Sequence, residues 1–386
     1  MFPRFSNSQL LTFVESYRLG SSALTVIILA HYLQPKPFIL FTLSVTLGNL
    51  IAIITNLGIT FWINVEPTFK NVNRARHAIH FVSYFGLAIL LILANSTFLK
   101  DVPLYWNLLI LSEYLLAGPI VFETRAFLAL RKLRKYIFFT IVQTTTRTLL
   151  LLLIIDQQIR TLAIVFYSIF TFLVWLRLHL MQLKFYKFEF RVLRYSIKKS
   201  LALGITGFLV TTIDSLPILY SGINLQNIDA GQIHIVLRIA SVSAIPMNSL
   251  AAVTLAKNAL TGERNYVRKH LIFSVFFSGF MIVFSGLILE YTDFLPSYPD
   301  VSHYLWASFL IVLFRSISIV YGNLLTLNKK NRYRFISLFI SLVVMLLLFS
   351  GVSSQMLQGE IITILLISIV TEFIAVSLIL FFGNRI

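Results

Sequence analysis

Residues 198–257 read KKSLALGITGFLVTTIDSLPILYSGINLQNIDAGQIHIVLRIASVSAIPMNSLAAVTLAK, and this stretch decides the fold. It holds two apolar runs, each near the ~20 residues needed to cross a bilayer, with a short turn between them. The first run contains Asp214 and the second contains Arg238. A charged side chain at the centre of a membrane span costs about 2.5–3.5 kcal/mol on insertion scales, so it usually faces a polar interior. We interpret the stretch as two membrane helices that begin the second half of a transporter.

The rest of the chain has the same character. Of its 386 residues, 58% are hydrophobic and 12% are charged, whereas an ordinary globular domain has about 25% charged residues. Apolar runs long enough to span a membrane recur along the whole length, which predicts an all-α polytopic membrane protein. The twelve predicted spans cover residues 9–30, 38–62, 79–98, 104–126, 136–155, 160–180, 200–220, 231–256, 270–289, 303–325, 335–353 and 361–382.

Basic residues set the orientation of these spans. The net charge of +17 is not spread evenly, because lysine and arginine gather in alternate connections such as 131–135, 184–199 and 257–269. The opposite side holds only Lys36, Lys100 and Arg160. Since positive residues mark the cytoplasmic side of a membrane protein, both termini are predicted to be cytoplasmic. The charge therefore indicates membrane topology, and no nucleic-acid partner is expected.

The longest connection, residues 181–199, divides the chain into two parts. Its alternating basic and aromatic residues favour a cytoplasmic helix lying at the membrane interface. Each part then has six spans and begins on the cytoplasmic side, which is typical of parallel repeats. The predicted organisation is a six-helix lobe over 1–180, an interfacial linker over 181–199, and a second six-helix lobe over 200–386.

Several classes of chemistry find no support in the residues. The sequence has no cysteine, which excludes disulfides and thiolate-bound metals, and it lacks the glycine-rich loops that hold nucleotide phosphates. The outer loops are short for an enzyme acting on lipid-linked sugars. His31, His234 and His303 fall near the outer face, and we interpret them as satisfied side chains without a metal. No enzyme activity and no cofactor are predicted.

The intramembrane charges are the candidate functional residues. Four arginines and four acids lie well inside predicted spans, away from their ends: Arg18, Arg147, Arg238 and Arg315, with Glu15, Glu113, Asp214 and Glu372. Equal numbers of each sign favour one hypothesis, that the charges pair off and hold helices together. Glu15 and Arg18 are three residues apart on one helix face, so these two are expected to pair locally.

A second hypothesis gives the same residues a transport role. A guanidinium group stays charged and presents a fork that matches phosphate oxygens, so the four arginines would line a central cavity for an anionic headgroup. The four acids would then form gating pairs or bind a coupling proton or sodium ion. Helix breakers within the spans favour bending at these positions: Gly118, Pro119, Gly204, Gly207, Pro217 and Pro246.

Residues 23–60 resemble the opening of polysaccharide flippases of the multidrug/oligosaccharidyl-lipid/polysaccharide exporter superfamily. In that family a turn after the first span leads to a second span with an LGL-type element, and His31-Tyr32-Leu33 and Leu57-Gly58-Ile59 occupy these places. The turn lacks the family's usual Arg and Gly. Ala230-Gly231-Gln232-Ile233, Arg238 and Ile245-Pro246 are similar to the family's eighth span.

The resemblance implies two six-helix lobes around a V-shaped central cavity and a flippase for undecaprenyl-diphosphate-linked oligosaccharide. Such a protein would serve O-antigen and lipopolysaccharide assembly in the bacterial inner membrane. Its expected partners are the lipid-linked oligosaccharide, membrane lipids, and a polysaccharide polymerase and chain-length regulator. Related lipid II flippases use arginines of the first and eighth spans, which assigns substrate contact first to Arg18 and Arg238.

Three alternatives stay open at the level of sequence. A multidrug or toxin cation antiporter of the same superfamily would share the fold, but its cationic substrates would favour an acidic cavity. A lipid II flippase would have two further spans. A membrane-embedded polysaccharide polymerase or ligase would need a larger outer loop than this chain provides.

Overall fold

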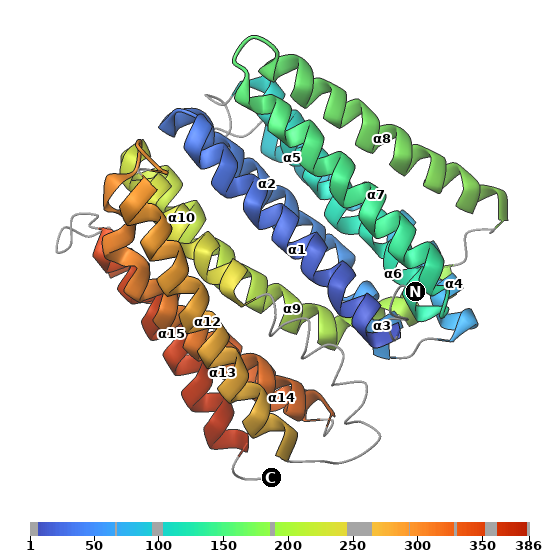
Figure 1. Ribbon diagram of the computed structural model, residues 1–386. Helices are drawn as coiled ribbons and strands as arrows, with labels where there is room; N and C mark the ends of the chain where they lie inside the picture. The colour runs from blue at the N-terminus through green and yellow to red at the C-terminus, as the bar shows by residue number, and fades with distance from the viewer. Residues whose placement is uncertain are drawn as a thin grey trace, which may run out of the picture. The chain divides into compact units, whose positions relative to one another are not determined.

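The structure is a computed structural model that describes residues 7–65, 68–94, 103–185, 190–244, 265–292, 294–327, 330–351 and 361–383. Every regular element in these ranges is a helix (Figure 1). Nine helices of the described part are long and apolar enough to cross a membrane. The prediction of an all-α, multi-pass membrane protein is confirmed.

Helices occupy each of the first six predicted spans. In chain order they are α1 Asn7–Tyr32, α2 Pro35–Asn56, α3 Ile59–Val65, α4 Phe69–Ala94, α5 Leu104–Leu115, a π-helical turn Leu116–Ile120, α6 Val121–Ala129, α7 Leu133–Leu152, a 3-10 turn Leu153–Ile155, and α8 Arg160–Phe185. Predicted span two is thus interrupted after Asn56, and predicted span four is continuous across three helical segments.

Helices also occupy the second six predicted spans. They are α9 Phe190–Asn224, α10 Asn227–Ser243, α12 Asn265–Thr292, a 3-10 turn Pro299–Tyr304, α13 Leu305–Leu327, α14 Asn331–Gly351 and α15 Ile361–Gly383. The C-terminal part of predicted span eight, from residue 245 and including Pro246, lies outside the described residues.

Pro119 does not end its helix. A proline has no backbone N–H to donate and its ring crowds the carbonyl four residues earlier. The chain widens here into the π-helical turn Leu116–Ile120, a local adjustment that lets a helix continue past such a residue. The predicted helix breaker is therefore accommodated within one membrane span, Leu104–Ala129.

Helix α9 is longer than the predicted seventh span. Its 35 residues rise about 52 Å, whereas the hydrocarbon core is about 30 Å thick. The turns 190–199, which the sequence assigns to the linker, run into the span without a break. The extra length and the basic residues Arg191, Arg194 and Lys198 are what a helix would have if its first turns lay outside the hydrocarbon. The position of these turns at the membrane interface stays a prediction.

Contacts between helices divide the chain into two compact units. Unit 1 contains Met1–Ile39 and Leu216–Ile386, and unit 2 contains Leu40–Ser215. In unit 1, α1 packs against α10, and α15 packs against both α13 and α14. In unit 2, α8 packs against α5 and α7. Helix α1 thus groups by contact with second-half helices, while the predicted division into two six-span lobes stays a prediction.

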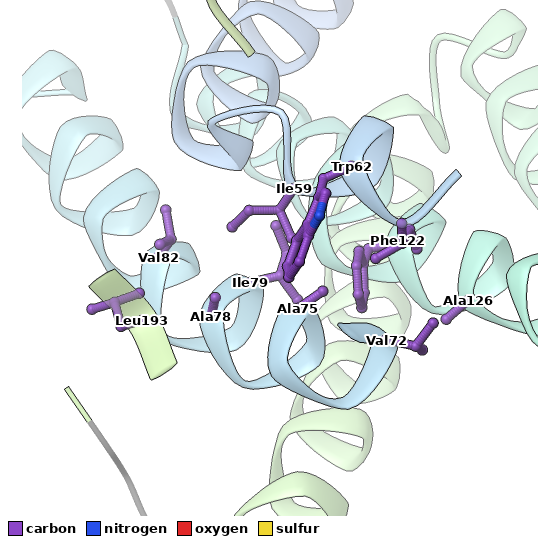
Figure 2. Close-up of a cluster of buried hydrophobic side chains, with 11 residues drawn as sticks. Ile59, Trp62, Val72, Ala75, Ala78, Ile79, Val82, Phe122, Ala126 and Leu193 are labelled. Atoms are coloured by element: carbon purple, nitrogen blue, oxygen red, sulfur yellow. The ribbon is translucent and has the colours of Figure 1, made fainter. Parts of the chain in front are cut away.

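A hydrophobic cluster forms the interior of unit 2 where α3, α4 and α6 meet. Figure 2 shows the Trp62 side chain of α3 extending towards Ala75 and Ile79 of α4, with Phe122 of α6 beside it. All four of these side chains are at most 2% exposed. The cluster is completed by Ile59, Ile63, Val72, Ala78, Val82, Ala126 and Leu193. This packing buries one face of α4 and holds the short helix α3 against it.

Two glycines let the backbones of unit 2 touch. The turn between α2 and α3 has left-handed backbone at Leu57 (φ 48°) and Gly58 (φ 73°). A Cβ atom on Gly204 of α9 would lie 2.4 Å from the Leu57 carbonyl carbon, and one on Gly58 would lie 2.2 Å from the Gly204 nitrogen. Because backbone atoms cannot move aside as a side chain can, neither position has room for a residue that carries a Cβ atom.

We expect Gly204→Ala to destabilise the protein by about 1–3 kcal/mol, the usual cost of forcing extra atoms into a packed interior. Gly20→Ala is the matched control, because a Cβ atom there meets nothing within 4 Å. Thermal unfolding of the purified proteins in one detergent measures the difference. Equal stability of the two variants would contradict the close contact between α9 and the α2–α3 turn.

Candidate functional site

The first predicted charge pair lies on α1. The Arg18 guanidinium donates to the Glu15 carboxylate from Nε at 3.2 Å and from Nη2 at 3.0 Å. The predicted local pairing is confirmed. The Arg18 side chain is nevertheless 34% exposed, more than that of any other arginine in the ion pairs described below. An exposed guanidinium group keeps donors available to a further ligand.

A buried network joins three helices of unit 2. Arg147 of α7 donates from Nε and Nη2 to the two carboxylate oxygens of Glu113 on α5, at 3.1 and 2.8 Å. Tyr167 of α8 donates its hydroxyl to Glu113 Oε1 at 2.9 Å. Glu113 and Tyr167 are each 1% exposed. The bidentate geometry and the third donor satisfy the carboxylate away from water.

A third pair links α13 and α15 in unit 1. Arg315 donates from Nε to Glu372 Oε1 at 3.0 Å, and its Nη2 lies 2.9 Å from the same oxygen. The two side chains are 17% and 9% exposed. Six of the eight predicted residues are therefore paired, and the pairs Glu113–Arg147 and Arg315–Glu372 also join different helices, as one hypothesis predicted.

Asp214 and Arg238 are not members of these three pairs. Asp214 is half-buried on α9 in unit 2, one residue before the unit boundary, and Arg238 is half-buried on α10 in unit 1. Their predicted roles in coupling and substrate contact stay predictions.

A fourth ion pair, between Arg76 and Glu123, was not predicted from the sequence. Arg76 of α4 donates from Nε to both oxygens of Glu123 on α6, at 3.2 and 3.0 Å. His80, one helical turn after Arg76, places its Nε2 atom 3.7 Å from Glu123 Oε1. Neither Arg76 nor Glu123 is among the residues that the sequence predicted for the site. The spacing of Arg76 and His80 on one helix face was the available clue, together with an acid inside predicted span four.

Two predicted outer-face histidines are hydrogen-bonded side chains, as expected. The Nδ1 atom of His31 bonds to the Phe294 carbonyl. The Nε2 atom of His234 lies 2.9 Å from the Ile218 carbonyl and 3.1 Å from the Ser221 hydroxyl, so α10 is fastened to the end of α9. Within the part of the chain that the structure describes, no group of three His, Cys, Asp or Glu side chains is arranged to hold a metal ion.

Known proteins resemble this chain in structure only. No protein-family model and no curated protein matches it. The eukaryotic MATE transporter AtDTX14 superposes with a TM-score of 0.62 at 11% identity, covering 98% of this chain and 94% of its own. An outward-facing multidrug resistance MATE family transporter of the MOP superfamily superposes at 0.59, with 14% identity over 99% of this chain and 96% of its own. An inward-facing structure of a transporter of the same description reaches 0.60, with 13% identity over 100% and 96%.

These similarities extend over nearly the full length of both proteins. At 11–14% identity they show the fold alone. The chain thus has the fold of MATE transporters of the MOP superfamily, which agrees with the superfamily that the sequence resembles. The finer resemblance, to the polysaccharide flippases within it, is taken up below.

We expect Glu113→Gln to cost about 3–5 kcal/mol of stability, because it leaves the Arg147 charge buried without its carboxylate. Glu15→Gln is the matched control and should cost at most about 1 kcal/mol, since the Arg18 pair is partly exposed. Thermal unfolding in detergent compares the two. Adding Arg147→Gln to Glu113→Gln should recover much of the loss, and a double variant as unstable as the single one would contradict a structural role for this pair.

Proposed function

We propose that the chain is a membrane transporter of the MOP superfamily that moves its substrate by alternating access. The observation that carries this proposal is the full-length fold match to MATE transporters in both inward-facing and outward-facing conformations. Alternation between two such conformations would expose one site to each side of the membrane in turn.

Pro217 is the bending point that we assign to this movement. It lies inside α9, two residues after the boundary between the contact units at Ser215. Because proline cannot donate to the carbonyl of Ile213, the helix is weakened at this turn. Helix α9 thus provides a continuous connection whose weakest turn falls at the point where the units join.

The first candidate substrate class is an organic cation or toxin. Two of the structural neighbours are multidrug resistance transporters, and this supports the export of such compounds. An organic cation needs an acidic partner in a site of low dielectric constant. We assign this role to Asp214, a half-buried carboxylate on α9 within the candidate membrane span Phe190–Asn224.

The second candidate is an undecaprenyl-diphosphate-linked oligosaccharide. The packing of α1 against α10 within unit 1 favours it, since Arg18 and Arg238 lie on these two helices. Both side chains are only half-buried, and a diphosphate would be bound by their guanidinium forks. Arg147 and Arg315 are weaker candidates, because their forks bind carboxylates away from water, whereas the Arg18 side chain is 34% exposed. A polysaccharide polymerase and a chain-length regulator would be partners of this second function.

Proteoliposomes containing the purified protein separate the two candidates. If the substrate is an organic cation, ethidium moves against its gradient and Asp214→Asn lowers the rate at least about tenfold, as expected for loss of a charged contact worth 1.5–3 kcal/mol. Glu290→Gln is the matched control, since Glu290 is exposed near the end of α12. Full ethidium transport by Asp214→Asn would contradict the first assignment.

If the substrate is a lipid-linked oligosaccharide, the glycan becomes accessible on the opposite leaflet. Arg18→Ala and Arg238→Ala should each slow this step by about tenfold or more without loss of protein from the membrane, and Arg→Lys should restore part of the rate. Arg332→Ala, at an exposed position of α14, is the control. Unchanged flipping by both alanine variants would contradict the second assignment, and absence of both activities in the wild-type protein would overturn the proposed function.

A further inference from the structure

A cluster of titratable side chains lies inside unit 2, where α4, α6 and α8 meet. It contains His80 and Tyr84 from α4, Glu123 from α6 and His179 from α8, with Arg76 one turn before His80. None of the substrate assignments above uses it. Both histidines are almost completely buried, with exposed fractions of 3% for His80 and 6% for His179.

His80 is the central residue of this cluster. Neither of its ring nitrogens has a hydrogen-bond partner among the described residues, although buried polar atoms nearly always have one. The Glu123 carboxylate lies 3.7 Å from Nε2 and is already held by Arg76. Addition of a proton to His80 would turn this near contact into a charge-assisted hydrogen bond.

His179 extends the cluster towards α8. Its ring centroid lies 5.5 Å from that of His80, its Nε2 atom is hydrogen-bonded to the Tyr84 hydroxyl, and the described residues offer no partner to its Nδ1 atom. The Trp175 ring stacks on His179 at 5.3 Å. Two buried imidazoles at this distance cannot both become charged without repulsion, so their protonation is coupled.

The surrounding helices carry further charged and titratable groups. Among them are Arg74, Arg76, His77 and Tyr84 on α4, Glu113 and Tyr114 on α5, Glu123 and Arg125 on α6, Tyr167, Arg177 and His179 on α8, and Arg191, Arg194, Tyr195, Lys198 and Lys199 on α9. The described side chains of α3, residues 59, 60, 62 and 63, carry no titratable group. The Tyr114 hydroxyl is committed to the Ser83 carbonyl at 2.7 Å. Among these groups Glu123 is the acceptor and His179 the competing base in contact with His80.

We propose that His80, Glu123 and His179 form a proton-binding site. One proton adds to the His80 Nε2 lone pair, the imidazolium donates it towards Glu123 Oε1, and the local charge of the Arg76–Glu123–His80 group rises from zero to plus one. No bond other than this N–H forms. Histidine is suited to this task, because its ordinary titration range lies between about pH 5 and 8.

The proton is the ligand that the site fits by chemistry. The described residues provide no three-ligand arrangement for a metal ion. Both imidazoles are buried, and the rings of Tyr84 and Trp175 contact His179. This role rests on the proposed transport function. The site would bind the coupling ion, because a proton bound here adds a buried charge that one conformation must stabilise better than the other. The carboxylates of Glu113 and Glu372 are already bound by arginines.

A measurement of proton binding tests the site without any transport assay. The chain has seven histidines, and NMR of the purified protein labelled at the histidine ring carbons follows each of them. His80→Gln and His179→Gln identify the two resonances by their loss, with His80→Asn as a second variant if the first does not fold. We expect the His80 resonance to shift when the sample is taken from pH 8 to pH 5, and the response of the His179 resonance to pH to change in His80→Gln. A His80 resonance that does not change over this range would overturn the proposal.

A transport measurement then separates coupling from transport itself. In proteoliposomes, His80→Gln should lose accumulation driven by a pH gradient by about tenfold, while exchange of labelled for unlabelled substrate at equal pH stays near the wild-type rate. His303→Gln is the matched control, because His303 is exposed in an outer turn. Gradient-driven accumulation that survives in both His80→Gln and His179→Gln would overturn the coupling role. If the wild-type protein shows no exchange of substrate, the proposed function is overturned instead.

Discussion

A charge within the membrane must have a partner, and this constraint governs much of the structure. Glu113 is 1% exposed and would be unstable there as an isolated carboxylate. Its two oxygens accept hydrogen bonds from Arg147 and Tyr167, which come from two other helices. Apolar side chains cannot fix the order of helices in lipid by hydrophobicity alone, because the lipid is as apolar as they are. The ion pairs therefore give α5, α7 and α8 a specific arrangement that the uniformly apolar surfaces could not.

The same constraint narrows the functional assignments. An arginine whose fork already holds a carboxylate can bind a phosphate only by releasing that carboxylate, and the released group would then be buried without its counter-ion. In the proposed function, Arg147 and Arg315 therefore stabilise the helix packing and do not contact the substrate. Arg18 keeps part of its surface exposed and lies on a helix packed against the one that carries Arg238. In the proposed flippase function, an anionic headgroup would bind at this helix pair of unit 1.

The sequence predicted the helices well, because the length of an apolar run is a direct consequence of bilayer thickness. Each predicted span coincides with a helix in the described residues, and the Glu15–Arg18 pair followed from a spacing of three residues. The pairs between helices were a different problem. Partners such as Arg76 and Glu123 are 47 residues apart, and only the packing of α4 against α6 brings them together. The continuation of α9 through 190–199 was missed for a related reason, since a basic interfacial helix and the solvated start of a membrane helix have the same composition.

Arginine and histidine have different electrostatic roles in unit 2. A guanidinium group remains charged at every physiological pH, so Arg147 and Arg76 can hold their carboxylates permanently but cannot respond to a proton gradient. An imidazole changes charge near neutral pH and needs an acceptor that is already in place. The Arg76–Glu123 pair provides that acceptor 3.7 Å from His80. In such a site no carboxylate has to change its own charge. The permanent Arg76–Glu123 pair holds the acceptor in place, and the histidine gains or loses the proton.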